Sequence, residues 1–119
     1  MRVPTDRSLA SWIRELIAEG RLYRFYKTDE WLALRDRILQ RSHCECEWCR
    51  DLGKYERAVT VHHVNEVKDR PELALSETYV ARGGKRKRNL IALCARCHNK
   101  AHKRFQGAKA RRQLNEERW

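Results

Sequence analysis

The sequence predicts a small metal-bound α+β domain, and three features of the chain support that class. The 119 residues match the length of one domain, and 41% of them are hydrophobic while 36% are charged. This balance favours a modest core that a bound metal stabilises. Two C-x-x-C pairs offer thiols for a metal, and two helical patterns precede two strand-like segments. Within one domain over 1–119 we expect a helical part at 1–42, a metal-binding core at 43–105 and a basic tail at 106–119.

The first predicted helix covers residues 8–20. Ser8 is a suitable N-cap, and Gly20 can end the helix in the left-handed conformation. One face is apolar at the spacing of a helix: Leu9, Trp12, Ile13, Leu16 and Ile17. The next residues, RLYRFYK at 21–27, alternate in part between polar and apolar side chains, so we expect a short extended link there.

A second helix is predicted over residues 29–41. Thr28 or Asp29 can cap it, Asp29 and Glu30 suit its positive end, and Arg41 suits its negative end. Its apolar stripe consists of Trp31, Leu34 and Ile38. We expect both helices to pack against the metal-binding half, since neither can bury its apolar face alone.

The second half of the chain predicts two strands and a helix. AVTVHHV is rich in β-branched residues and predicts a strand at 58–64, and NLIALC predicts another at 89–94. A helix is expected to start near residue 95. The 24 residues between the strands form an unusually long loop for a small domain, and such loops are often functional.

The cysteines predict a structural zinc site. Cys46 and Cys49 form one C-x-x-C pair and Cys94 and Cys97 the other, and each pair can supply two corners of a tetrahedron. Charged residues interrupt the first twenty positions, so we expect no signal peptide and a reducing, cytoplasmic location where such cysteines bind metal. Cys44 is interpreted as a bystander thiol, with substitution for Cys46 as the alternative.

Four histidines accompany these cysteines. His98 and His102 are four residues apart, so a helix would present both imidazoles on one side. His62 and His63 lie at the end of the predicted strand. If the cysteines hold one metal, three imidazoles can hold a second ion and leave coordination positions open, which is the requirement of a catalytic site.

The order of these motifs resembles that of the HNH endonucleases, and more closely their short cysteine-containing members carried by bacteriophages. The resemblance rests on FYKTDEWLALRDRILQR, CEWC, VHHVNEV and NLIALCARCHNKAH, and covers residues 25–103. It implies a ββα-metal core, treble-clef-like, in which two strands and a helix surround one catalytic divalent ion. It also implies a DNA endonuclease, nicking or double-strand, that acts in the host cell cytoplasm if a phage encodes it, with a packaging terminase as a candidate partner.

The resemblance implies a role for each matched residue. His63 matches the general base, Asn89 the middle letter of the motif and His98 the closing histidine. His62 and His102 match further ligands of the divalent ion. Neighbouring strand residues face opposite sides, so an exchange of roles between His62 and His63 stays open. For Asn89, we expect its amide to brace the loop that orients His63; a simple turn residue is the alternative.

These residue types predict the hydrolysis of phosphodiester bonds. A Mg²⁺, Mn²⁺, Ni²⁺ or Zn²⁺ ion on three histidines would bind the scissile phosphate, and His63 would take a proton from the attacking water. A zinc-stapled DNA-binding or adaptor module without nuclease activity is the rival hypothesis. The complete histidine set argues against it, because an adaptor has no need of those residues. RNA as the substrate stays open.

The charge of the chain favours a polyanionic partner. The formal net charge is +11, with 27 Lys and Arg against 16 Asp and Glu. Five cations occupy residues 82–88, RGGKRKR, which we expect to be a mobile DNA-tracking arm; a solvated loop is the alternative. The predicted nucleic-acid-binding residues are Arg82, Lys85, Arg86, Lys87, Arg88, Lys103 and Arg104.

Overall fold

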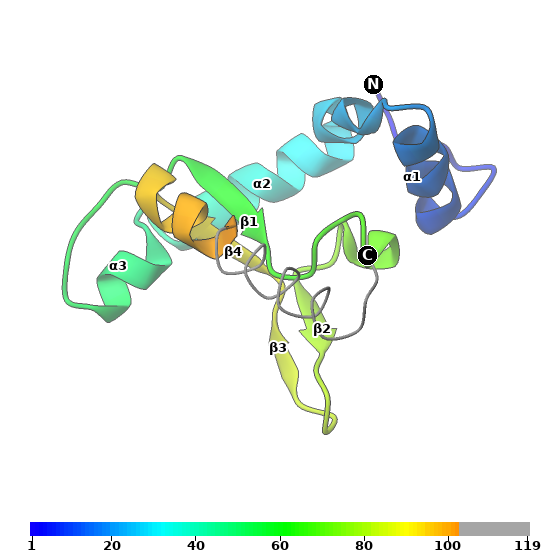
Figure 1. Cartoon of the computed structure of the whole chain (residues 1–119). Coiled ribbons are helices and arrows are strands. Elements are labelled where there is room, and N and C mark those ends of the chain that lie inside the picture. Colours follow the sequence, from blue (N-terminus) through cyan, green and yellow to red (C-terminus); the bar gives the residue numbers. More distant parts are fainter. Residues whose placement is uncertain (103–119) are drawn as a thin grey trace, which may run out of the picture.

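The computed structural model describes residues 1–102, and Figure 1 shows how their elements are arranged. In chain order these are α1 (Leu9–Ala18), η1 (Leu22–Lys27), α2 (Asp29–Arg41), α3 (Glu47–Asp51), β1 (Thr60–His63), η2 (Pro71–Leu73), β2 (Thr78–Val80), β3 (Arg86–Arg88) and β4 (Leu90–Leu93). Residues 95–102 form a further helix directly after β4. No helix among those described is long and apolar enough to cross a membrane. The predicted basic tail at 106–119 lies outside the described residues.

Both N-terminal helices are confirmed, together with their caps. The Ser8 hydroxyl accepts a hydrogen bond from the Ser11 backbone N–H at 3.1 Å, and the Thr28 hydroxyl accepts one from Trp31 at 3.2 Å. These bonds satisfy backbone donors that the first turn of a helix leaves without a partner. Gly20 follows α1 with a φ of +69°, the left-handed conformation that glycine adopts without strain.

The extended link expected at residues 21–27 is wrong, because most of this segment forms the 3₁₀ helix η1. Leu22 and Phe25 are three residues apart and therefore share one side of a 3₁₀ turn. The fully buried Phe25 packs in the core, and the Thr28 hydroxyl donates a hydrogen bond to its carbonyl at 2.7 Å. Burial of Phe25, with Leu22 partly buried three residues earlier, thus outweighs the partial alternation of the sequence.

The central sheet pairs β1 with β4 in antiparallel fashion and has different neighbours on its two faces. Val61 and His63 face the main core, whose buried residues from α1, η1 and α2 are Trp12, Ile13, Leu16, Phe25, Trp31, Leu34 and Ile38. Leu93 belongs to a second cluster with the paired cysteines and Ala101. Because alternate residues of a strand face opposite sides, His62 and His63 leave β1 in opposite directions.

The long loop predicted between the strands contains regular structure. After η2, strands β2 and β3 pair in antiparallel register and project from the domain as a hairpin, here called the basic hairpin, residues 78–88 (Figure 1). Gly83 and Gly84 turn the chain at φ values of +91° and +85°. The prediction of one long loop is therefore corrected, since residues 82–88 form the turn and the second strand of this hairpin. The glycines build a tight turn between two strands, and all seven residues from 82 to 88 are exposed.

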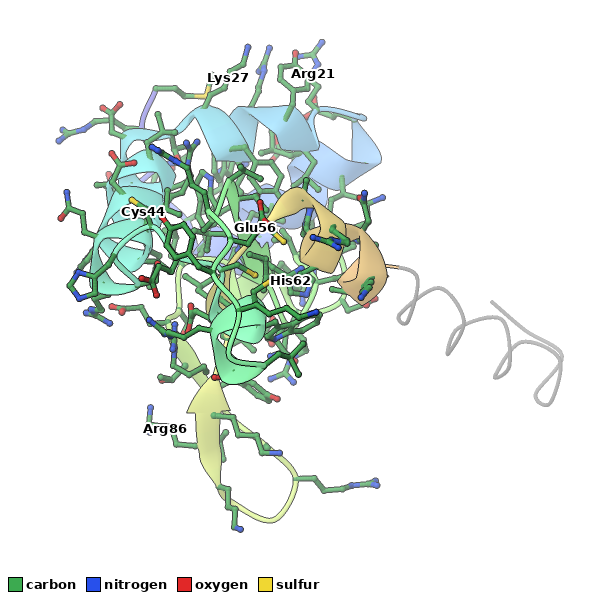
Figure 2. The ribbon with its side chains drawn as sticks, turned by 90° about the vertical axis from the view of Figure 1, so that its left-hand side faces the viewer. Arg21, Lys27, Cys44, Glu56, His62 and Arg86 are labelled. Atoms are coloured by element: carbon green, nitrogen blue, oxygen red, sulfur yellow. The ribbon has the colours of Figure 1, made fainter. Side chains whose placement is uncertain are left out.

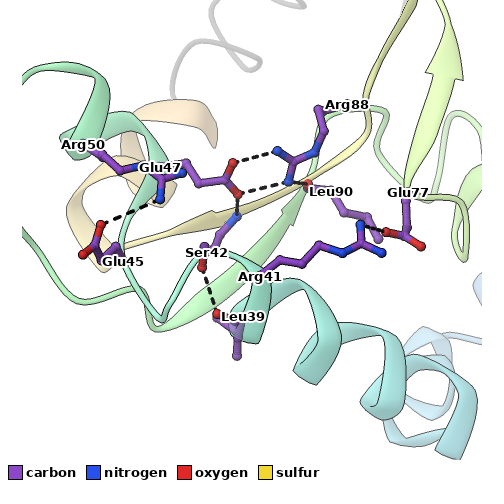
Figure 3. Close-up of polar contacts among 10 residues, drawn as sticks. Leu39, Arg41, Ser42, Glu45, Glu47, Arg50, Glu77, Arg88 and Leu90 are labelled. Carbon is purple, nitrogen blue, oxygen red and sulfur yellow. Dashed lines mark hydrogen bonds and ion pairs between the residues drawn. The ribbon is translucent and has the colours of Figure 1, made fainter.

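Ion pairs fix the base of the basic hairpin to the rest of the domain (Figure 3). Glu77, just before β2, pairs with Arg41 of α2. Arg88, at the end of β3, donates to both carboxylate oxygens of Glu47 at 2.8 and 3.2 Å and to the Leu90 carbonyl at 2.8 Å. The second Glu47 oxygen also accepts the Ala92 backbone N–H at 2.8 Å. The hairpin is therefore held where it meets α2, α3 and β4.

Candidate active site and metal centres

The two cysteine pairs come together in a buried cluster, as predicted. Cys46 caps α3 and Cys94 directly precedes the helix at 95–102, so each pair sits at the start of a helix. The sulfur atoms of Cys46, Cys49, Cys94 and Cys97 all lie within 4.8 Å of one another. Cys44 lies outside this cluster and is partly exposed.

The spacing of the sulfurs fits a tetrahedral ion. The Cys49 sulfur lies 3.9 Å from that of Cys94 and 3.7 Å from that of Cys97. Four thiolates bound to zinc at about 2.3 Å would stand about 3.8 Å apart. The Cys97 backbone N–H also points at the Cys94 sulfur, 3.5 Å away. The cluster therefore has the donor set and the dimensions of a structural metal site.

The protonation of these thiols depends on their burial and on one another. Burial, together with hydrogen bonds to the other cysteines, raises the pKa of Cys97 to about 12. For Cys46, burial also opposes ionisation, but hydrogen bonds from Cys94 and Cys49 outweigh it and lower the pKa to about 7. One thiolate is thus accessible near neutral pH, and a cation is needed to hold all four in that form.

Three histidines form a second cluster in the same part of the chain. His62 comes from β1, and His98 and His102 come from one face of the following helix. One ring nitrogen from each lies within 4.8 Å of the others, and the Nε2 atoms of His98 and His102 are 2.9 Å apart. Two nitrogens bound at about 2.1 Å and at right angles to one ion would be separated by about 3 Å.

The surroundings of this cluster favour neutral imidazoles with available lone pairs. Burial, followed by the charges of His98, His102 and His63, lowers the pKa of His62 to about 4. Burial likewise lowers the pKa of His98. A Glu66 carboxylate oxygen lies 3.8 Å from Nδ1 of His102, on the side away from the cluster, where a carboxylate can orient a metal-binding histidine.

His63 is held in a separate aromatic environment. Its ring stacks on Trp31 with centroids 4.8 Å apart and an interplanar angle of 22°, and Phe25 and Tyr26 also contact it. Its Nε2 lies 2.9 Å from the Ala74 carbonyl oxygen. Because a carbonyl only accepts, Nε2 carries the proton and Nδ1 of the neutral ring keeps its lone pair. Burial lowers the pKa of His63, although the bond to Ala74 opposes that shift.

Asn89 is fully buried and braces the loop that contacts His63. Its Oδ1 accepts hydrogen bonds from the backbone and side-chain amides of Asn65 at 3.0 and 2.9 Å. Its Nδ2 donates to the carbonyls of Leu73 and Ser76, both at 3.0 Å. Ala74, the partner of His63, lies between those two residues. Asn89 thus ties the end of β1 to the segment that fixes the His63 ring, which goes beyond a turn residue.

One cavity of about 660 Å³ connects the histidines. Its lining includes His62 and His63, both at the end of β1, together with His98 and His102. Although the two neighbouring histidines point in opposite directions, both reach this cavity.

Tyr26, Trp31 and Arg35 also line the cavity; from the sequence, Trp31 was predicted as a core residue and the other two were not predicted. Arg35 is one helical turn after Trp31 on α2, so it shares the face that meets β1. The four-residue spacing from Trp31 was therefore a signal in the sequence that Arg35 lies on the same face of α2.

The predicted basic residues divide into three groups. Arg82, Lys85 and Lys87 are exposed on the basic hairpin, and Arg86 donates to the Thr78 hydroxyl at 3.0 Å. Arg88 is bound to Glu47, so its charge is already compensated. Lys103 and Arg104 lie outside the described residues. Three further cations, Arg21, Arg24 and Lys27, lie in RLYRFYK, where they are interspersed with aromatic residues.

Comparisons with known proteins identify the family. The model of the HNH endonuclease family matches residues 46–104, a span that includes both clusters and Asn89. A similar solved structure is that of an HNH endonuclease from the deep-sea thermophilic bacteriophage GVE2, crystallised with a manganese ion. It is 24% identical, with a TM-score of 0.59 over 89% of this chain and 98% of that one, which establishes a shared fold. No curated protein matches the chain. The two clusters and the matched family model lead to one conclusion: residues 46–104 form an HNH endonuclease domain, and the protein is a nuclease, a phosphodiester hydrolase.

Proposed function

We propose that the protein is a divalent-metal-dependent DNA endonuclease whose active centre is the cavity between the histidines. The observation that carries this proposal is the convergence of three imidazoles, from His62, His98 and His102, beside a fourth histidine with an unprotonated Nδ1. A site that only bound DNA would need neither a metal cluster nor a base. Both face one cavity large enough for a phosphodiester group.

The ligand atoms of the two clusters support two different metal ions. The four cysteines suit a structural zinc that closes its coordination with protein ligands. The three histidines suit a catalytic divalent ion, Mg²⁺, Mn²⁺, Ni²⁺ or Zn²⁺, because three ligands leave positions open. When bound, that ion supplies Lewis-acid stabilisation to the scissile phosphate and to the departing oxygen. Imidazole ligands favour the transition metals over Mg²⁺.

His63 is the proposed general base. The Ala74 carbonyl fixes the tautomer with the proton on Nε2, so Nδ1 can accept a proton from an attacking water. Stacking on Trp31 holds the plane of the ring, and burial favours the neutral form that a base requires. These contacts support the assignment of His63 as base and His62 as ligand over the exchanged roles.

Asn89 is a positioning residue in this proposal. Its amide holds the Leu73–Ser76 segment, and that segment presents the Ala74 carbonyl to His63. Loss of the amide would therefore release the base from its fixed orientation without removing a group that touches substrate. Its four hydrogen bonds to three other residues support this role.

DNA is the proposed substrate, bound through phosphate contacts. Figure 2 shows Arg21 and Lys27 at one end of the molecule and Arg86, on the basic hairpin, at the opposite end. His62 lies between these two ends. Cations on both sides of the cavity could contact a backbone that passes over it. The exposed Arg82, Lys85 and Lys87 are the strongest candidates on the hairpin, and Arg86 the next. A partnership with a phage terminase stays a prediction from the resemblance.

Plasmid cleavage tests the proposed function. Supercoiled DNA incubated with the purified protein should be converted to the open-circle form in the presence of Mn²⁺, Ni²⁺ or Mg²⁺, and EDTA should prevent the conversion. A single-stranded RNA of equal charge serves as the control substrate. Conversion that persists in EDTA would refute the metal dependence, and cleavage of RNA alone would refute the assignment to DNA.

A further inference from the structure

Arg35 is a cation of the cavity wall without a partner. It lies on α2 one turn after Trp31, and it lines the same cavity as the four histidines. Its Nε is buried and makes no hydrogen bond to any residue of the described part, 1–102. Arg35 also forms no ion pair with those residues. It is one of two residues in that part of the chain with a buried side-chain atom lacking a partner; the other is Glu30.

Two other arginines of the same helix differ from Arg35. Arg37 and Arg41 both pair with Glu77, at the base of the basic hairpin. Arg35 is on another side of α2 and is directed to the sheet side, where no described carboxylate meets it. A buried guanidinium donor that has lost its hydrogen bonds to water and has gained no acceptor is destabilising, so its position in the wall calls for an anionic or polar ligand.

The charge of the cavity indicates which ligand that is. Arg35 and Lys68 line it as cations, and Glu66 is the one acid among its described residues. Glu66 is near His102. The cavity therefore favours an anion, and a planar guanidinium can donate two parallel hydrogen bonds to the oxygens of a phosphate.

We propose that Arg35 is a further substrate-binding residue of this centre, whose guanidinium donates to a nonbridging oxygen of the scissile phosphodiester. This inference rests on the proposed function. In the cleavage step, the water oxygen forms a new bond to phosphorus and its proton passes to Nδ1 of His63. The bond from phosphorus to the 3′ oxygen breaks, and that oxygen takes a proton from solvent. Arg35 transfers no proton. It offsets the negative charge that builds on the phosphate oxygens.

A small activated diester separates this role from general DNA binding. Bis(4-nitrophenyl) phosphate offers one phosphodiester and no extended backbone, so only groups at the reacting phosphate can act on it. Arg35→Ala should lower nitrophenolate release and plasmid nicking alike, each by about 10²-fold, the loss typical of removing one donor to a developing oxyanion. Arg35→Lys should recover part of the activity, and added guanidinium should partly restore Arg35→Ala.

Arg37→Ala is the matched control, because it removes an arginine of the same helix that pairs with Glu77 and does not line the cavity. It should hydrolyse the small diester within about twofold of the parent. Equal activity of Arg35→Ala and the parent on that diester would overturn the inference. If Arg35→Ala proves unfolded by circular dichroism, Arg35→Lys decides instead: a folded protein with parental activity overturns the inference, and a folded protein with a loss of tenfold or more supports it.

His63→Ala in the same assay separates a failure of the role proposed for Arg35 from a failure of the proposed function. Loss of activity in His63→Ala with full activity in Arg35→Ala would refute only the role of Arg35. Full activity in His63→Ala would refute the proposed function itself, whatever Arg35→Ala does.

Discussion

Loss of one cysteine ligand should destabilise the whole domain, and Cys94→Ser is the sharpest form of that test. Cys49 and Cys94 are 45 residues apart in the chain, and the cluster joins them across the sheet. Closing a loop of that length lowers the entropy of the unfolded chain by the equivalent of about 4 kcal/mol at 25 °C in the cross-link model. This is a lower bound, because the lost metal–ligand bonds add to it.

That magnitude is large for a domain of this size. A chain of 119 residues is expected to have a stability of roughly 6–18 kcal/mol, so the loss removes a large share of it. The melting temperature should fall by roughly 15 °C, if the variant folds at all. Thermal unfolding followed by circular dichroism, together with zinc analysis of the same sample, measures both effects.

Cys44→Ser provides the matched control, because Cys44 lies in the same segment but outside the cluster. It should keep about one zinc per chain and a melting temperature near that of the parent. A Cys94→Ser protein that melts like Cys44→Ser and contains no zinc would refute the argument that the cluster closes the fold.

Three further changes have distinct expected results. His98→Ala should lose the second ion but keep the zinc, and excess Mn²⁺ should partly restore nicking through His62 and His102; metal analysis showing both ions retained would contradict the ligand set. Joint replacement of Lys85 and Lys87 by Ala should lower the salt dependence of DNA binding by about one unit of slope per lost phosphate contact. Arg88→Ala should instead mainly lower the melting temperature, because Arg88 is bound to Glu47. Equal salt slopes for the parent and the double variant would show that the hairpin does not contact DNA. Asn89→Asp should lower both stability and cleavage, since a carboxylate cannot donate to the Leu73 and Ser76 carbonyls; a variant with parental melting and nicking would refute the bracing role.

Local patterns in the sequence were enough to predict the framework. The caps at Ser8 and Thr28 lie three residues from the N–H groups that they bind, so a short window contains both partners. The C-x-x-C pairs and the spacing of His98 and His102 likewise fix ligand geometry within one turn. The resemblance to a family then predicted how these pieces combine, and the family model bears it out.

Features that depend on distant partners could not be predicted in the same way. Arg88 pairs with Glu47, which is 41 residues earlier in the chain. The sequence around Arg88 or around Glu47 gives no indication of this ion pair. The segment at 21–27 forms η1 because Phe25 fills the core beneath His63, and that core exists only after α2 and β1 have packed. Arg35 is identified as unusual only when the partners of its neighbours on α2 are known.

The most direct test of the central claim compares plasmid nicking by the parent and by His63→Ala, with metal analysis of the same preparations. The claim is that His63 is a base held by Ala74 and Trp31, while His62, His98 and His102 bind the ion. His63→Ala should keep both metals and its affinity for DNA, while nicking falls by about 10²-fold or more. Nicking at the parental rate would contradict the claim, and loss of the second ion from His63→Ala would show that His62 and His63 have exchanged roles.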